Sequence, residues 1–186
     1  INELSRISAQ LLTMFIIVAI INAINFIDGI DGLALAVITF FILLFEILAN
    51  NSTPFLNLSI ILLTIFIPMF YFNFRKNKKV FLGDSGSLFL GGLVSVYVMH
   101  ILSNEYIINI EYDVNKLFYV FSILTYPIVD LSRIVIVRIS KGVSPFKADH
   151  NHIHHILFRK YKSHIMVVVI LLTISFINLI LIQVLL

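Results

Sequence analysis

The sequence predicts an all-α fold, a polytopic membrane helical bundle, and three observations support this class. Hydrophobic residues make up 60% of the 186 positions, charged residues make up only 12%, and the mean hydropathy is +1.03. Soluble domains, by contrast, carry about 25% charged residues. The apolar residues also form continuous runs rather than the alternating segments of a membrane β-barrel. We therefore expect a single membrane domain over residues 1–186.

Six apolar runs are long enough to be transmembrane helices, because about 20 mostly apolar residues cross a hydrocarbon core of about 30 Å. They cover roughly residues 8–24, 33–49, 56–73, 86–102, 117–138 and 165–186. Pro68 and Pro127 fall inside the third and fifth runs and predict kinks there. The sequence contains no cysteine, which excludes disulfides and thiolate metal sites.

Basic residues predict the orientation of these spans. Most of the 13 Lys and Arg follow the third and fifth runs: Arg75, Lys76, Lys78, Lys79, Arg138, Lys141, Lys147, Arg159, Lys160 and Lys162. The positive-inside rule places these connections, and the one after the first run, in the cytoplasm. We therefore expect a multi-pass protein of the inner or plasma membrane. Such basic connections attract anionic headgroups or phosphate-bearing substrates. The net charge of +3 therefore requires no nucleic-acid partner.

The first polar segment, residues 22–34, reads NAINFIDGIDGLA and separates the first two runs. Asp28 and Asp31 present two carboxylates three residues apart, and the glycines that follow them permit close approach to a ligand. One interpretation is structural, with Asp31 as a helix N-cap and Asp28 in a turn. The other is functional, because Mg²⁺ is commonly held by one or two carboxylates plus substrate phosphates.

The second polar segment, residues 81–87, reads FLGDSGS and precedes the fourth run. Asp84 or Ser85 could cap that helix, with Ser87 and Gly91 as a small-residue packing face. A helix N-terminus also favours an anion. Because Asp84 lies on the same predicted side as the two acids of the first segment, the three carboxylates together predict a metal and phosphate site.

The third polar segment, residues 138–164, is long for a connection and holds four histidines within six residues, namely His150, His152, His154 and His155. Loops longer than about 12 to 15 residues are usually functional or disordered. A zinc site is the main competitor, but His152, His154 and His155 are not spaced i, i+4 and no HExxH pattern surrounds them. Solvated surface histidines are the structural alternative. The cluster, with basic residues nearby, favours donation of hydrogen bonds or charge to a diphosphate.

Two ionisable residues lie inside the fifth run. Asp130 and Arg133 are three residues apart and so share one helix face. Charges inside a membrane are costly and normally paired. We expect the pair to point into the bundle or its cytoplasmic cavity, as a structural ion pair or facing a substrate.

These segments, in this order and on one side, resemble the polyprenyl-phosphate N-acetylhexosamine-1-phosphate transferases, glycosyltransferase family 4. The resemblance rests on NAINFIDGIDGLA, FLGDSGS and the HIHH cluster after SPFKADHN. It implies transfer of a sugar 1-phosphate from a UDP-N-acetylhexosamine to undecaprenyl phosphate, which releases UMP and starts a cell-envelope glycan. The HIHH form is similar to the branch that uses UDP-N-acetylglucosamine or a related aminosugar.

The resemblance also implies residue roles. It places Mg²⁺, or Mn²⁺ in its place, on Asp84 together with Asp28, and a uracil-stacking ring at Phe81. It assigns nucleotide, sugar, diphosphate or catalytic contacts to Asn22, Asn25, Asp28, Asp31, His152, His154 and His155. The Asp130 and Arg133 pair resembles an Asp-x-x-Arg pattern of the same branch.

One feature departs from the family. Its members have about ten helices and an adjacent Asp pair in a cytoplasmic loop before NxxDGxDG, whereas this sequence begins at Ile1 and contains no adjacent Asp pair. We therefore expect the 186 residues to be the C-terminal part of a longer enzyme, and to lack activity alone if they are the whole chain.

Two further classes stay open. A transporter would also gather acids and kinked helices, but along a path between the two sides of the membrane. A non-catalytic subunit that binds lipid phosphate or nucleotide would fit the missing acids. The sequence leaves the particular aminosugar and the oligomeric state open, a homodimer included.

Overall fold

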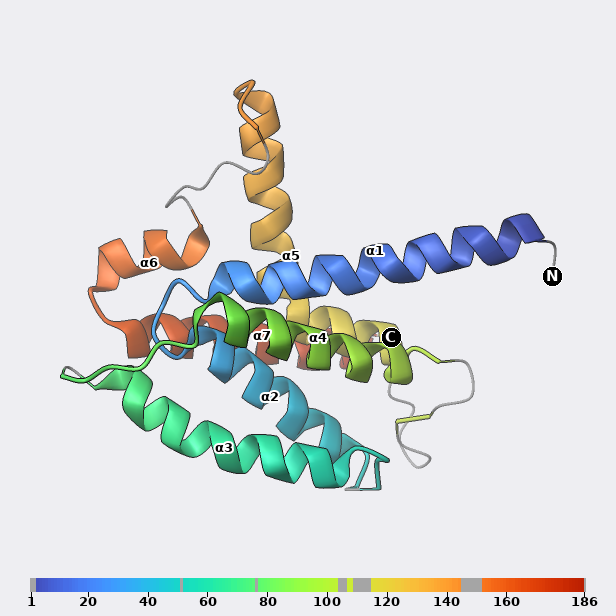
Figure 1. The fold of residues 1–186 in the computed structure, drawn as a ribbon, viewed down its shortest axis with the longest axis horizontal. Helices are drawn as coiled ribbons and strands as arrows, with labels where there is room; N and C mark the ends of the chain where they lie inside the picture. Colours follow the sequence, from blue (N-terminus) through green and yellow to red (C-terminus); the bar gives the residue numbers. More distant parts are fainter. Residues whose placement is uncertain are drawn as a thin grey trace.

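The computed structural model describes residues 3–50, 52–75, 77–103, 107–108, 115–144 and 152–185. These residues form helices and connections, and no strand occurs among them. The seven helices (Figure 1) are α1 (Glu3–Ile27), α2 (Leu33–Leu48), α3 (Leu56–Phe74), α4 (Gly83–Ile101), α5 (Lys116–Ser140), α6 (Ile153–Tyr161) and α7 (His164–Leu185). The all-α class predicted from composition is thus confirmed.

Five helices, α1, α3, α4, α5 and α7, are long and apolar enough to cross a membrane, which makes this a multi-pass membrane protein. The run predicted as a sixth span, residues 33–49, forms a helix of 16 residues, α2. Sixteen residues rise about 24 Å, less than the roughly 30 Å of a hydrocarbon core. The prediction of six spans is therefore not confirmed.

The short helix α2 is the innermost helix of the bundle. It contacts α1, α3, α4, α5 and α7. Its buried apolar side chains are Leu33, Ala34, Leu35, Ala36, Val37, Ile38, Phe41, Ile42 and Phe45. A helix that is apolar all round must be enclosed on all sides, by protein or by lipid. Here protein covers most of the helix, although Leu43 and Ile47 are exposed. Sequence alone does not distinguish this case from a lipid-facing span.

Helices α1 and α4 pack closely because small residues line their contact. A Cβ on Gly91 would lie 2.9 Å from the Cα of Ile21, so only glycine allows this approach. One helical turn earlier, the Ser87 hydroxyl accepts a hydrogen bond of 2.9 Å from the Asn25 side chain. The interpretation of Ser87 and Gly91 as a small packing face is therefore confirmed.

Helix α5 changes direction along its length, and its C-terminal half stands away from the other helices (Figure 1). Pro127 lies inside this helix and has no N–H to donate to the preceding turn. The bend agrees with the kink predicted there. It matters for the site because Asp130 lies only three residues further on.

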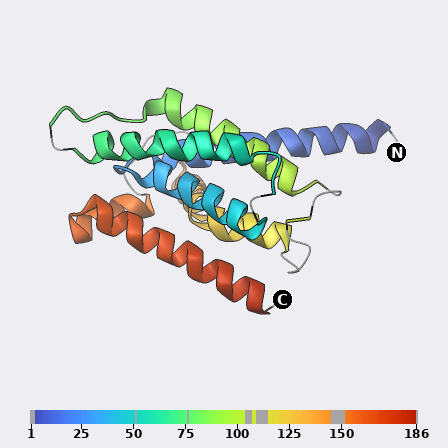
Figure 2. The same ribbon diagram turned by 90° about the horizontal axis from the view of Figure 1, so that it is seen from below.

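The connections α1–α2, α3–α4 and α6–α7 lie at one end of the bundle in both views (Figures 1 and 2). Helix α1 begins and α7 ends at the other end. The first two polar segments and α6 of the third thus lie at one end, whereas the C-terminal end of α5 stands away from it.

Candidate active site

The first two polar segments meet through a side-chain contact between helix ends. Helix α1 continues to Ile27, so Asn25 lies in its last turn rather than in a loop as the sequence suggested. Its amide nitrogen Nδ2 lies 3.4 Å from Oδ1 of Asp84 in the first turn of α4. The end of α1 therefore positions an acid of α4.

Asp28 and Asp84 form a pair of repelling carboxylates. Burial raises the pKa of Asp28 to about 7, and the negative charge of Asp84 adds to this increase, whereas a hydrogen bond from the Gly83 backbone opposes it. A divalent cation between two such carboxylates would remove the repulsion, and hard oxygen ligands suit Mg²⁺. The donor set therefore fits the expected cation.

Helix capping does not explain the acids. The N-cap of α2 is Gly32 and that of α4 is Leu82, and neither makes a side-chain capping hydrogen bond. Asp84 lies inside the first turn of α4, where a carboxylate interacts favourably with the helix dipole. The capping interpretation of Asp31, Asp84 and Ser85 is therefore wrong.

Asp31 is held by partners that the sequence did not single out. Lys79 forms an ion pair with its carboxylate, which is 12% exposed. The backbone N–H of Asp31 donates to Nδ1 of His164 at 3.2 Å. These partners lie 48 and 133 residues away, so no local pattern could have indicated them. Asp31 thus links the α1–α2 connection to both other connections at this end.

The histidines lie on or next to a helix, not in an irregular loop as predicted. Within the third polar segment, α6 begins at Ile153, with His152 as its N-cap residue. His152 and His154 are 5% and 0% exposed, so the surface-histidine interpretation is wrong for both. His155 is half-buried, and its ring centroid lies 4.3 Å from that of His154. His150 lies outside the described residues.

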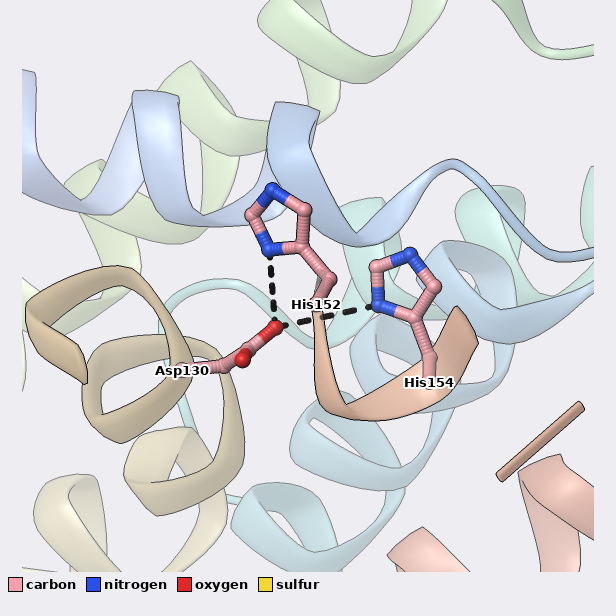
Figure 3. Close-up of side chains that lie close together, drawn as sticks. All are labelled: Asp130, His152 and His154. Atoms are coloured by element: carbon pink, nitrogen blue, oxygen red, sulfur yellow. Dashed lines mark hydrogen bonds and ion pairs between the residues drawn. The ribbon is translucent and has the colours of Figure 1, made fainter. Parts of the chain in front are cut away.

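Asp130 organises the start of α6 (Figure 3). Its Oδ1 accepts hydrogen bonds from the Arg133 guanidinium at 3.0 Å and from the Ile153 backbone N–H at 3.0 Å. Its Oδ2 lies 2.9 Å from Nδ1 of His152. The predicted pair of Asp130 and Arg133 is therefore confirmed, and it also fixes the place of the histidines.

The same three side chains raise the question of a second metal site. One ligand atom each from Asp130, His152 and His154 lies within 4.8 Å of the others, although their sequence spacing argued against zinc. A cation there would compete with the Arg133 guanidinium, and both Asp130 oxygens already accept hydrogen bonds. The arrangement therefore favours a hydrogen-bonded cluster over metal ligation.

His154 is a neutral side chain in this setting. Burial, followed by the neighbouring charges of His155 and His152, lowers its pKa to about 3. Its Nδ1 lies 2.6 Å from the hydroxyl of Tyr126 on α5. At neutral pH His154 can therefore offer a hydrogen bond to a phosphate, but not the positive charge that the sequence left open.

Two other predicted residues have clear positions. The ring of Phe81 is 68% exposed, with Nζ of Lys79 at 5.1 Å from its centroid, so it is accessible for stacking. The Asn22 amide instead donates to the carbonyl of Val18 in its own helix at 2.7 Å. Among the described contacts, Asn22 is therefore tied to α1 rather than to the acids.

Fold and site together define a multi-pass membrane protein with a carboxylate pair and a histidine cluster at one end of its helices. A family model described as "Glycosyl transferase family 4" matches residues 1–102. The chain therefore belongs to glycosyl transferase family 4. No solved structure matches it.

Curated relatives agree with this family. The chain is 36% identical over 169 residues to a "Probable undecaprenyl-phosphate N-acetylglucosaminyl 1-phosphate transferase" of Bacillus subtilis (strain 168), covering 89% of this chain and 45% of the relative. It is 32% identical over 183 residues to the "Decaprenyl-phosphate N-acetylglucosaminephosphotransferase" of Mycobacterium leprae (strain TN), covering 90% and 46%. The chain spans about half the length of the curated relatives it matches.

Proposed function

We propose that this chain takes part in transferring N-acetylhexosamine 1-phosphate, with N-acetylglucosamine as the sugar, from its UDP derivative to undecaprenyl phosphate. A phosphate oxygen of the lipid attacks the phosphorus that carries the sugar. The bond from that phosphorus to the bridging oxygen breaks, and UMP leaves with that oxygen. The observation that carries the proposal is the meeting of the Asp28 and Asp84 pair with the histidine cluster at one end of the membrane helices.

The acids would hold the cation that this reaction needs. Asp84 and Asp28 are the proposed ligands of Mg²⁺, or of Mn²⁺, which would neutralise charge on the diphosphate. Asn25 orients Asp84 through its amide, and the ion pair with Lys79 holds Asp31 in place. Phosphoryl transfer depends mainly on such positioning and charge neutralisation.

The remaining residues would bind the donor. The exposed ring of Phe81 is the proposed stacking surface for uracil. His154 and His155 would donate hydrogen bonds to phosphoryl oxygens or the sugar, and Asp130 with Arg133 would hold His152 and the start of α6. Basic residues near these groups support a cytoplasmic site in the plasma membrane.

An apolar groove supports a lipid substrate. It has a volume of about 600 Å³ and lies between α1, α4 and α5, with Phe15, Val98 and Leu124 among its lining residues. The lining continues to Leu131 and Ser132, next to Asp130 in sequence. A polyprenyl chain in this groove would bring its phosphate towards the polar end of α5.

A transporter is not favoured, because the ionisable groups of the site gather at one end rather than along a path through the bundle. A non-catalytic binding subunit would hold the same ligands without turnover. Release of UMP separates this class from a transferase.

The test is incorporation of radiolabelled UDP-N-acetylglucosamine into butanol-extractable lipid, in membranes that express the protein from its native locus. We expect labelling that requires Mg²⁺ and disappears in Asp84→Ala. The matched control is Ser85→Ala, which removes an exposed neighbour in the same helical turn and should keep the activity. Absence of labelled lipid and of UMP release with a panel of UDP-aminosugars would contradict the transferase.

A further inference from the structure

The His154 ring packs directly against the backbone of Gly29. A Cβ on Gly29 would be 2.9 Å from Nε2 of His154 and 3.1 Å from Cε1 of His155. Because Gly29 has no side chain, the histidine rings can lie this close to the first polar segment.

The Nε2 atom of His154, which lies beside Gly29, is buried and has no hydrogen-bond partner in the part of the chain that the structure describes. Leaving a buried polar atom without a partner is destabilising. Such an atom in a native protein calls for an explanation, and a bound ligand or water is one of the ordinary ones.

The other ring nitrogen of His154 faces Tyr126. The Tyr126 side chain is buried, and its hydroxyl lies 2.6 Å from Nδ1. This hydroxyl can donate its proton to Nδ1 or accept a proton from it, since a tyrosine hydroxyl is both a donor and an acceptor.

Asp130 does not replace Tyr126 in this role. Its Oδ2 lies 3.9 Å from Nδ1 of His154, which is too long for a hydrogen bond, and the same oxygen is 2.9 Å from His152. When Tyr126 donates to Nδ1, the single proton of the neutral ring is on Nε2, and the buried Nε2 then has a proton to offer to a ligand.

We propose that Tyr126 is a positioning residue, which holds His154 in the tautomer with Nε2 protonated, so that this N–H is available to a phosphoryl oxygen of the donor. This inference rests on the proposed transferase function for the identity of the ligand. Tyr126 touches no reacting atom and acts only through His154.

The first test reads the tautomer directly and needs no activity. ¹⁵N spectra of histidine-labelled protein in nanodiscs distinguish protonated from unprotonated ring nitrogens, and His154 is assigned by the signal lost in His154→Asn. We expect Nε2 protonated and Nδ1 unprotonated in the wild type, and a mixture of both tautomers in Tyr126→Phe. A wild-type ring protonated on Nδ1, or an unchanged spectrum in the variant, would overturn the proposal.

The second test is kinetic. Partners that orient a histidine through its other nitrogen contribute about 10- to 100-fold in metal sites. We expect Tyr126→Phe to lower kcat about tenfold while KM changes less than about twofold, because the contact acts mainly in the transition state. In the double variant with His154→Asn, Tyr126→Phe should cause no further loss of kcat. If the two losses of kcat are additive, Tyr126 does not act through His154.

Tyr119→Phe is the matched control. Tyr119 is a fully buried residue of the same helix, and its hydroxyl donates to the Phe41 carbonyl at 2.7 Å, away from the histidines. Tyr119→Phe should lower stability as Tyr126→Phe does, but it should leave kcat unchanged. If both variants lose kcat equally, Tyr126 has only a structural role. If the ¹⁵N spectra show the expected tautomer but no lipid is labelled in the transfer assay, the proposed function is contradicted. The relation of Tyr126 to His154 would still hold.

Discussion

The side-chain amide of Asn25 lies 3.4 Å from the carboxylate of Asp84 and so connects the end of α1 to the start of α4. The position of this acid depends on how closely the two helices pack. They approach closely at Gly91, where a Cβ would lie 2.9 Å from the backbone of Ile21. Packing inside the membrane therefore determines the geometry of the site at its surface.

Gly91→Ala should separate α1 from α4. Because the clash is with backbone, which cannot rotate away, we expect a loss of about 1–3 kcal/mol, the usual cost of overpacking. Gly92→Ala is the control, since a Cβ there meets nothing within 4 Å. It should be neutral or stabilise α4 by up to about 1 kcal/mol. Unfolding in detergent measures both, and equal effects would contradict this account of the helix contact.

The affinity for Mg²⁺ should increase with pH. Asp28 binds a cation only when ionised, and its pKa is raised from 3.8 to about 7. About a tenth of this carboxyl is ionised at pH 6 and about nine tenths at pH 8, so the apparent affinity should rise roughly tenfold over that range. Mg²⁺ titration of the transfer rate measures this effect. Asp28→Asn should bind the cation more weakly, and its Mg²⁺ affinity should no longer depend on pH. If the affinity of this variant still rises with pH, the titrating group is not Asp28.

The same raised pKa has a consequence for folding without a cation. Between pH 3.8 and about 7 the native protein holds a proton on Asp28 that the unfolded chain has released. Stability should therefore fall as the pH rises through this window, and Asp28→Asn should reduce the fall. Thermal unfolding in EDTA at several pH values measures it.

The ion pair of Asp31 and Lys79 should stabilise the arrangement of the two connections that it joins. Both side chains are largely buried, at 12% and 26% exposed. A double-mutant cycle of Asp31→Asn and Lys79→Gln should give a coupling free energy of about 1 kcal/mol. Lys78→Gln, at an exposed neighbouring position, should show no coupling to Asp31. Unfolding free energies provide the values, and a coupling near zero would mean that the pair contributes nothing.

Asp130→Asn should loosen the start of α6. The backbone N–H of Ile153 now donates to a charged oxygen at 3.0 Å, and loss of a hydrogen bond to a charge costs about 1.5–3 kcal/mol. Exchange of this amide with deuterium should accelerate about tenfold or more. Ser132→Ala is the control, because that hydroxyl donates to the Ile128 carbonyl of its own helix. Unchanged exchange in Asp130→Asn would contradict the role given to Asp130.

Gly29→Ala should displace the His154 ring. A Cβ would lie 2.9 Å from Nε2 of a fully buried ring that has little freedom to move. We expect transfer activity to fall at least tenfold, in the range of a lost transition-state hydrogen-bond donor, together with a loss of stability from overpacking. Assays of lipid labelling and of thermal unfolding, run beside Gly92→Ala, test this expectation. Full activity in Gly29→Ala would show that transfer does not depend on the position of the His154 ring.

Local features of the sequence predicted much of the molecule. Long apolar runs predicted the helices, because helix formation in lipid depends on length and hydrophobicity alone. The i, i+3 spacing of Asp130 and Arg133 predicted their contact for the same local reason. The sequence also predicted that the polar segments share one side, since two crossings return a chain to the same side, but that argument counted residues 33–49 as a span, which is not confirmed.

Contacts between distant residues needed the tertiary structure. Packing decided that α2 is an enclosed helix of 16 residues rather than a confirmed span, because protein and lipid are equally apolar partners for its side chains. Packing also paired Lys79 with Asp31 and brought His154 against Gly29. The sequence by itself determined which residues could carry the chemistry. The tertiary structure decided which of them meet, because those distances depend on how the helices pack and where α5 bends.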